Sequence, residues 1–185
     1  MPPKAKFTKE EIIAAALKIT REQGIGAVTA RELGARLGSS ARPVFTVFSS
    51  MEEVAEEVVR AAKVCYKKYI DRGLAEEVPF KGVGMQYIRF AKEETELFKL
   101  LFMTGKENMP ESFEVMPAVD DNYKRILKSV RESYHLTEER AERIYRHLWI
   151  YTHGIAVLFA SGVSSFSEDE IDDLISEIFL GLMKN

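Results

Sequence analysis

The chain has 185 residues, 46% hydrophobic and 30% charged, which suffices for a core in one or two domains. Its single cysteine, Cys65, excludes a disulfide framework and a cysteine-cluster metal site, and is itself expected to be a small buried residue rather than a redox sensor. Because no signal peptide and no long uncharged apolar run is present, the sequence predicts a cytoplasmic protein without a membrane partner.

The formal net charge of −3 is unevenly distributed. Residues 1–50 contain eight basic and four acidic side chains, a net charge of +4, which leaves −7 for the remainder. Attraction to phosphates requires local rather than global positive potential. The asymmetry is compatible with DNA binding by the N-terminal part, although many proteins that bind no nucleic acid share it.

The first helix is predicted to follow a basic arm at residues 1–6. Thr8 and Glu11 have the spacing of a capping box, and Gly24 marks the end of the helix. Its apolar side chains recur at helical spacing, which predicts that one face of this helix packs against the next segment.

Residues 29–48 read as two short helices joined by a tight turn. Thr29 and Glu32 form a second capping box, Gly38 lies at the turn, and Ser39 and Ser40 are candidate N-caps. Pro43 is tolerated only in the first turn of a helix, so the second helix begins at about Ala41 or Arg42. We expect it to direct Val44, Phe45 and Phe48 inward. This is a helix-turn-helix, which places its second helix in the major groove of DNA.

The rest of the chain is also helical by pattern, and about nine helices are expected in an all-α fold. Capping boxes begin at Ser50 and Ser167, and Thr137 is a further helix start. No strand-like alternation occurs. The predicted helices cover residues 51–74, 80–94, 96–103, 118–134, 138–160 and a final helix after Ser167.

The segment "PVFTVF", followed by "SSMEEV", resembles the N-terminal domain of the TetR/AcrR family of bacterial one-component regulators. Farther on, "HLWIYTHGIAVLFASG" resembles the Trp-His-Gly ligand-binding domain of one branch of that family. The resemblance implies an N-terminal DNA-binding domain at 1–50, a connecting helix at 51–74, and a ligand-binding and dimerisation domain at 75–185. It implies a homodimeric repressor that leaves a near-palindromic double-stranded DNA operator when a small, mostly apolar ligand binds.

Arg31 and Arg42 are the candidate base readers, because arginine pairs with the O6 and N7 atoms of guanine. For each, the alternative is a solvated surface arginine. The full set of candidate DNA-binding residues is Thr29, Arg31, Ser39, Ser40, Ala41, Arg42, Pro43, Phe45 and Thr46.

The sequence departs from the family pattern at two positions. The family usually has a phosphate-binding tyrosine where Phe45 stands, and often a lysine where Met51 stands. Both departures imply weaker attraction to the DNA backbone. They support an alternative function, a helical ligand-binding or interaction module that has lost specific DNA binding.

Aromatic and methionine side chains are dense in the C-terminal part, which, with the resemblance, predicts an apolar ligand cavity. The alternative is a filled core. The candidate ligand-binding residues are Met85, Phe90, Phe102, Met103, Phe113, Met116, Tyr123, Trp149 and His153.

Surplus apolar surface on the last two helices predicts dimerisation through a four-helix bundle. The candidate interface residues are Ile155, Leu158, Phe159, Leu174, Ile175, Ile178, Phe179 and Leu182. His147 and His153 are six residues apart and face different directions on a helix, so we predict no metal site. No catalytic motif is present, and no cofactor or enzymatic activity is expected.

Overall fold

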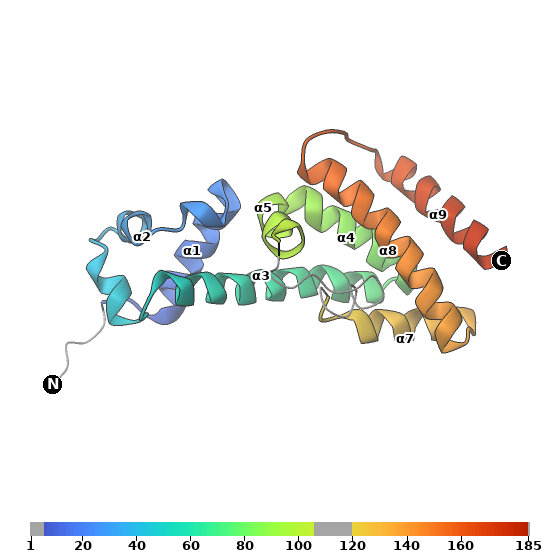
Figure 1. The fold of residues 1–185 in the computed structure, drawn as a ribbon, viewed down its shortest axis with the longest axis horizontal. Coiled ribbons are helices and arrows are strands. Elements are labelled where there is room, and N and C mark those ends of the chain that lie inside the picture. The colour runs from blue at the N-terminus through green and yellow to red at the C-terminus, as the bar shows by residue number, and fades with distance from the viewer. Residues whose placement is uncertain (1–5, 106–119, 185) are drawn as a thin grey trace. The chain divides into compact units, whose positions relative to one another are not determined.

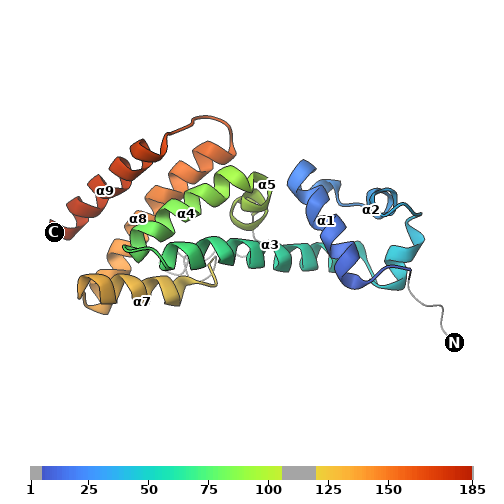
Figure 2. The same cartoon turned by 180° about the vertical axis from the view of Figure 1, so that it is seen from behind.

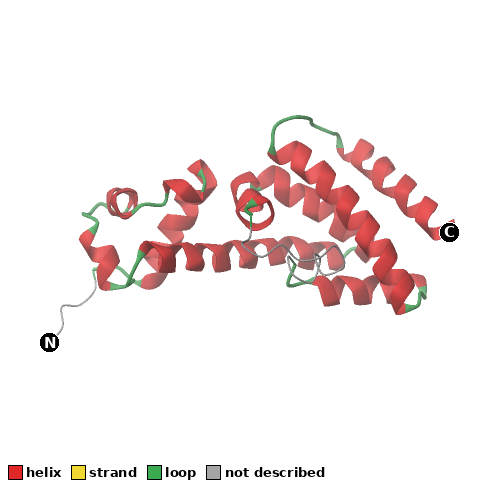
Figure 3. Cartoon of the chain, viewed as in Figure 1, coloured by secondary structure: helices red, strands yellow, loops and turns green. Residues whose placement is uncertain are grey.

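The computed structural model describes residues 6–105 and 120–184, and within these ranges every regular element is helical (Figures 1 and 3). The all-α prediction is confirmed. The elements are α1 (Lys9–Gln23), η1 (Ile25–Ala27), α2 (Ala30–Arg36), η2 (Arg42–Thr46), α3 (Met51–Leu74), α4 (Pro79–Glu93), α5 (Thr95–Phe98), η3 (Lys99–Met103), α7 (Tyr123–Tyr134), α8 (Glu138–Ala160) and α9 (Glu168–Lys184).

Contacts divide the chain into two compact units. The first contains Met1–Cys65 and Glu96–Met103, and the second contains Tyr66–Thr95 and Thr104–Asn185. The division falls inside α3, so this one helix contributes side chains to both units. The functional boundaries proposed from the sequence at residues 50 and 75 stay predictions.

The first unit has a core built from α1, α2, η2 and the first half of α3. Its fully buried members include Ile12, Leu33, Val44 and Val58. Partly buried apolar side chains pack against the edge of this core; they include Phe7, Ile13, Leu17 and Leu37. Burial of these faces holds the short elements together, since helices of this length are marginal in isolation.

In the second unit, α4 and α8 lie side by side in both views (Figures 1 and 2). The helix α7 packs against both α4 and α8, and α9 also packs against both. No helix among residues 6–105 and 120–184 is long and apolar enough to cross a membrane.

Helix starts follow the predicted capping residues. Both halves of the capping box form at Thr8 and at Ser167, and Thr137 accepts the Arg140 N–H at the start of α8. At Thr29 only half of the box forms: the hydroxyl accepts the Glu32 N–H at 3.1 Å. The Glu32 carboxylate instead pairs with Arg36.

One predicted helix start is wrong, and one predicted helix is only partly α-helical. The helix α7 begins at Tyr123, because the Asp120 carboxylate accepts the Asn122 N–H at 2.7 Å and holds residues 120–122 in a turn. Residues 118 and 119, the start predicted from the sequence, lie outside the described ranges. The predicted helix at 96–103 is a short α-helix, α5, that continues as a π-helical turn, η3.

The backbones of α3 and α4 meet at two glycines. A Cβ atom added at Gly73 would lie 2.6 Å from the Val83 nitrogen, and one added at Gly82 would lie 2.5 Å from the Gly73 carbonyl oxygen. Both distances are far below van der Waals contact, and the opposing atoms belong to backbone that cannot rotate away. The close crossing therefore requires glycine at both positions.

Replacing Gly82 with alanine should destabilise the protein by about 1–3 kcal/mol, because the overpacking cost exceeds the gain in helix propensity. Urea unfolding measures the change. Gly84→Ala, two residues along the same helix, is the matched control: its Cβ would make ordinary contacts at 3.6 Å. That variant should be neutral or up to about 1 kcal/mol more stable. Equal stability of the two variants would contradict a close crossing.

Candidate functional site

The helix-turn-helix predicted for residues 29–48 is present in the first unit. The helix α2 ends at Arg36, and Gly38 adopts a left-handed backbone conformation with φ of 64°. A Cβ atom at Gly34 would lie 2.6 Å from the Ser40 carbonyl carbon. The absence of a side chain at Gly34 thus lets the turn fold closely onto α2.

The second helix of the motif, η2, is a 3₁₀ helix of five residues. Val44 and Phe48 are buried as predicted, but Phe45 is 50% exposed, so its predicted inward orientation is wrong. Phe45 directly follows Val44, and adjacent residues of a helix point about 100–120° apart, so the burial of Val44 turns Phe45 toward solvent. The N-cap is Ala41, so the prediction that Ser39 or Ser40 caps this helix is wrong.

Polar side chains predicted to contact DNA are accessible on and beside this motif. The Ser39 hydroxyl accepts a hydrogen bond from the Lys6 ammonium at 3.1 Å, and the Thr46 hydroxyl donates to the Pro43 carbonyl at 2.7 Å. Thr29 is engaged as the N-cap of α2, and Ser40 is exposed. Ala41 and Pro43 are half-buried at the start of η2.

The arginines of the motif differ in their partners. Arg36 is bound by Glu22 at 2.9 Å and by Glu32 at 3.5 Å. The hydrogen bond from Arg36 lowers the pKa of Glu22. Arg31 and Arg42 are exposed and make no ion pair within residues 6–105 and 120–184. They are therefore available to an external anion.

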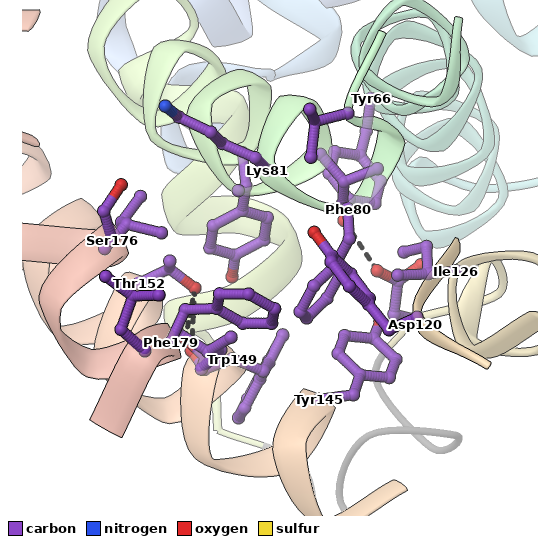
Figure 4. Close-up of a pocket in the computed structure, with 18 residues that line it drawn as sticks. Tyr66, Phe80, Lys81, Asp120, Ile126, Tyr145, Trp149, Thr152, Ser176 and Phe179 are labelled. Atoms are coloured by element: carbon purple, nitrogen blue, oxygen red, sulfur yellow. Dashed lines mark hydrogen bonds between the residues drawn. The ribbon is translucent and has the colours of Figure 1, made fainter. Parts of the chain in front are cut away.

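The second unit contains a partly open cavity of about 260 Å³ between its helices (Figure 4). Aromatic rings from five helices, α3, α4, α7, α8 and α9, dominate its wall; they are Tyr66, Phe80, Tyr87, Tyr134, Tyr145, Trp149 and Phe179. Phe80 is packed edge-to-face against Tyr145 at a centroid distance of 5.8 Å and against Phe179 at 6.4 Å. Tight ring packing fixes this wall while leaving the centre open.

One buried carboxylate lies in the wall. Asp120 is 3% exposed, and its oxygens accept hydrogen bonds from the Tyr66 hydroxyl at 2.6 Å and from the Asn122 side-chain amide at 3.1 Å, besides the Asn122 N–H. The Tyr66 bond is drawn in Figure 4. Burial, with a contribution from the Asp120 charge, raises the pKa of Tyr66 well above its ordinary value, so this phenol stays a donor.

Two buried polar atoms in the wall have no hydrogen-bond partner within the described ranges: the Tyr145 hydroxyl and the Trp149 indole nitrogen. Burial raises the pKa of Tyr145 well above its ordinary value, so its hydroxyl stays protonated. An unsatisfied buried polar atom costs free energy of about 1–3 kcal/mol. A bound molecule with matching polar groups would remove that cost.

A histidine supports the wall from behind. The His153 ring stacks on Trp149 with an interplanar angle of 7° and shares a 2.9 Å hydrogen bond with the Tyr87 hydroxyl. Burial lowers the pKa of His153, so its ring is neutral at pH 7. His153 therefore orients Tyr87 and Trp149 rather than lining the cavity itself.

The predicted ligand-binding residues are dispersed. Trp149 lines the cavity; Tyr123 stacks on Tyr145, and Phe90 packs against Tyr66, each behind the wall. Met85 lines a separate small cavity with Arg89 and Glu168. Phe102 and Met103 belong to the first unit. Phe113 and Met116 lie outside the described ranges.

Sequence reasoning missed most of the cavity wall. Tyr66 lies on the same helical repeat as Val58, Ala62 and Tyr69, so periodicity marked that face as buried without separating core from cavity. Asp120 stands before a helix rather than within its periodic stripe. Only its place in an Asp-Asp-Asn run, typical of a helix start, could have signalled a structural role.

The predicted interface residues of α8 and α9 fall into two groups. Ile155 and Ile175 are each 5% exposed, and Ile175 and Phe179 line the cavity. The others are half-buried; they are Leu158, Phe159, Leu174, Ile178 and Leu182. Ile150, which was not predicted, is 56% exposed on α8. Within residues 6–105 and 120–184, no cluster of side chains could hold a metal ion.

Similarity to solved structures is broad but distant. A protein of unknown function from Rhodococcus sp. RHA1 covers 100% of this chain and 97% of its own, with a TM-score of 0.71 and 18% identity. A transcriptional regulator from the same source covers 95% of each chain, with a TM-score of 0.64 and 14% identity. RolR in complex with resorcinol covers 93% of this chain and 85% of its own, with a TM-score of 0.56 and 12% identity. At such identities the likeness shows the fold.

No curated protein matches the chain. Residues 12–58 match the family described as bacterial regulatory proteins, tetR family, and residues 80–179 match the tetracyclin repressor-like C-terminal domain. The second match does not confirm the Trp-His-Gly branch. Because it spans more than half of the chain, and the N-terminal match covers the helix-turn-helix, the chain belongs to the TetR family of transcriptional regulators.

Proposed function

We propose that this regulator is a ligand-responsive repressor, released from a near-palindromic operator when a small, mostly apolar molecule enters the cavity of the second unit. The observation that carries this proposal is the aromatic cavity of about 260 Å³ with unpartnered polar atoms in its wall. A cavity of this kind is the usual form of a small-molecule site. Resorcinol bound to RolR, a protein of similar fold, supports a ligand of this size class.

The DNA contact is assigned to η2 and the start of α2. Arg42 leads η2 and Arg31 lies in the first turn of α2; both are exposed and without an ion pair among the described residues. Such side chains are suited to bidentate hydrogen bonds with guanine. Phe45 is exposed on the same short helix but has no hydroxyl for a phosphate, which is the observation that favours the alternative of a module without specific DNA binding.

The homodimer is assigned to α8 and α9. Ile150 is largely exposed, Leu158 is half-buried, and a Cβ atom at Gly154 or Gly181 would meet nothing within 4 Å, so both helices present an open apolar face. A symmetric pair of such faces forms an isologous four-helix contact. Two recognition helices held about one DNA turn apart then match a near-palindromic site.

Arg42→Ala should weaken specific DNA binding by about 1–3 kcal/mol and relax the preference at one base pair of each half-site. Lys6→Ala should instead weaken binding to all sequences alike and flatten the salt dependence. Fluorescence anisotropy with DNA flanking the protein's own gene measures both. Arg60→Ala is the control, because Glu56 and Glu57 already bind that guanidinium.

If wild-type protein shows no salt-sensitive binding to any DNA tested, the module without DNA binding replaces the repressor. If Arg42→Ala binds every sequence as tightly as wild type, Arg42 reads no base.

Ile150→Glu should convert the dimer to monomer, because a charge would be buried in an apolar contact without a partner. Sedimentation equilibrium at micromolar concentration measures the change. Val64→Glu is the matched control, since Val64 is 60% exposed on α3. Ile150 is preferable to Ile175 or Phe179, whose substitution would also damage the cavity wall. Wild-type protein that sediments as a monomer would refute the dimer.

A thermal-shift screen of small aromatic compounds should yield hits that raise the melting temperature, quench the fluorescence of Trp149 and release DNA. Trp149 is the only tryptophan and lines the cavity. Gly84→Leu should abolish all three responses while keeping DNA binding, since its side chain would point toward Thr152 and Ile175 in the cavity wall. Hits that act equally on Gly84→Leu would place the ligand elsewhere.

A further inference from the structure

The charge inside the cavity is negative. Asp120 is the buried charged group among the described lining residues, and its hydrogen bonds come from neutral donors, the Tyr66 hydroxyl and the two nitrogens of Asn122. The one cationic side chain of the described wall, Lys81, is 41% exposed and bound by Asp172 at 2.5 Å. A buried carboxylate without a cation is costly.

Other groups add to this negative potential. The faces of aromatic rings carry partial negative charge, and the cavity is walled by them. Burial raises the pKa values of Tyr66, Tyr87 and Tyr145, and the Asp120 charge raises all three further. Arg125, a short distance along the chain, does not offset it, because its guanidinium binds Asp71 and the Asn122 amide oxygen.

The volume of the cavity suits a ligand of one or two rings. An engineered cavity of about 150 Å³ accommodates benzene. At about 260 Å³ this cavity has room for a bicyclic ring with a short side arm. The unpartnered Trp149 indole nitrogen and Tyr145 hydroxyl offer hydrogen bonds near the ring.

We propose that the cavity selects a small organic cation, an aromatic or bicyclic body with a protonated amine directed at Asp120, and rejects carboxylates of the same size. This inference rests on the ligand site of the proposed function and specifies its chemistry. The ammonium group pairs with the Asp120 carboxylate and with the ring faces around it. A carboxylate would instead meet like charge with no buried cation among the described lining residues.

The test uses three probes with one bicyclic ring and different head groups: tryptamine (cation), tryptophol (neutral alcohol) and indoleacetate (anion). Isothermal titration calorimetry on the full-length protein should rank them in that order, with tryptamine at least about tenfold tighter than tryptophol. In Asp120→Asn, which keeps the acceptor oxygen for Asn122, the advantage of tryptamine should fall below about threefold, with little change for tryptophol.

Asp173→Asn is the matched control, because it removes the same charge from an exposed site on α9 outside the cavity wall. It should retain the wild-type ranking. Circular dichroism and melting temperature establish that each variant is folded. The wild-type ranking tests the proposal even if Asp120→Asn does not fold.

Tighter or equal binding of tryptophol or indoleacetate to wild-type protein overturns the selection for a cation but leaves the ligand site standing. A tryptamine advantage that persists in Asp120→Asn overturns the role of Asp120. If none of the three probes binds while the thermal-shift screen yields hits that depend on Gly84, the selection for a cation is refuted and the ligand site stands. If that screen also yields none, the ligand site fails with it.

Discussion

The close crossing of α3 and α4 at Gly73 and Gly82 sets the geometry on which the cavity depends. The helix α3 supplies Tyr66 to the cavity wall, and α4 supplies Phe80, Val83 and Tyr87. Because the opposing atoms at the crossing are backbone, the two helices have no freedom to adjust their separation there by rotating side chains. The rings that these two helices supply are consequently held at fixed positions around the open centre.

Holding this centre open is costly. Side chains that line an empty space lose the dispersion contacts that a filled core would give them. Unpartnered polar atoms at Tyr145 and Trp149 add to the cost. An occupant that fills the space and bonds these atoms would return much of that free energy, which is the physical basis for expecting a ligand here.

The sequence was sufficient for the helices and insufficient for the cavity. Capping residues such as Thr8, Thr137 and Ser167 act within one turn, so they predict helix starts without tertiary information. Helical periodicity identifies a buried face, but Phe90 in the core and Tyr87 at the cavity share that property. Which ring meets a void depends on how helices from distant parts of the chain cross. The predicted inward orientation of Phe45 is wrong because Phe45 directly follows Val44, and adjacent residues of a helix point in different directions.

The helix α3 contributes both to the core of the first unit, which carries the proposed DNA-binding residues, and to the cavity wall of the second. It contributes Val54 and Val58 to the core of the first unit and Tyr66, two turns later, to the hydrogen bond with Asp120. A ligand that binds Asp120 would compete for or reinforce that bond, and so would favour one placement of Tyr66 over another. A ligand shifts a conformational equilibrium only by its differential affinity for the two states. A charged head group at a buried carboxylate would bind the two states with very different affinities. Small displacements of Asp120 change both its distance to the cation and its contact with Tyr66. The same chemistry that selects the ligand would then bias α3, a long helix that contributes to both units.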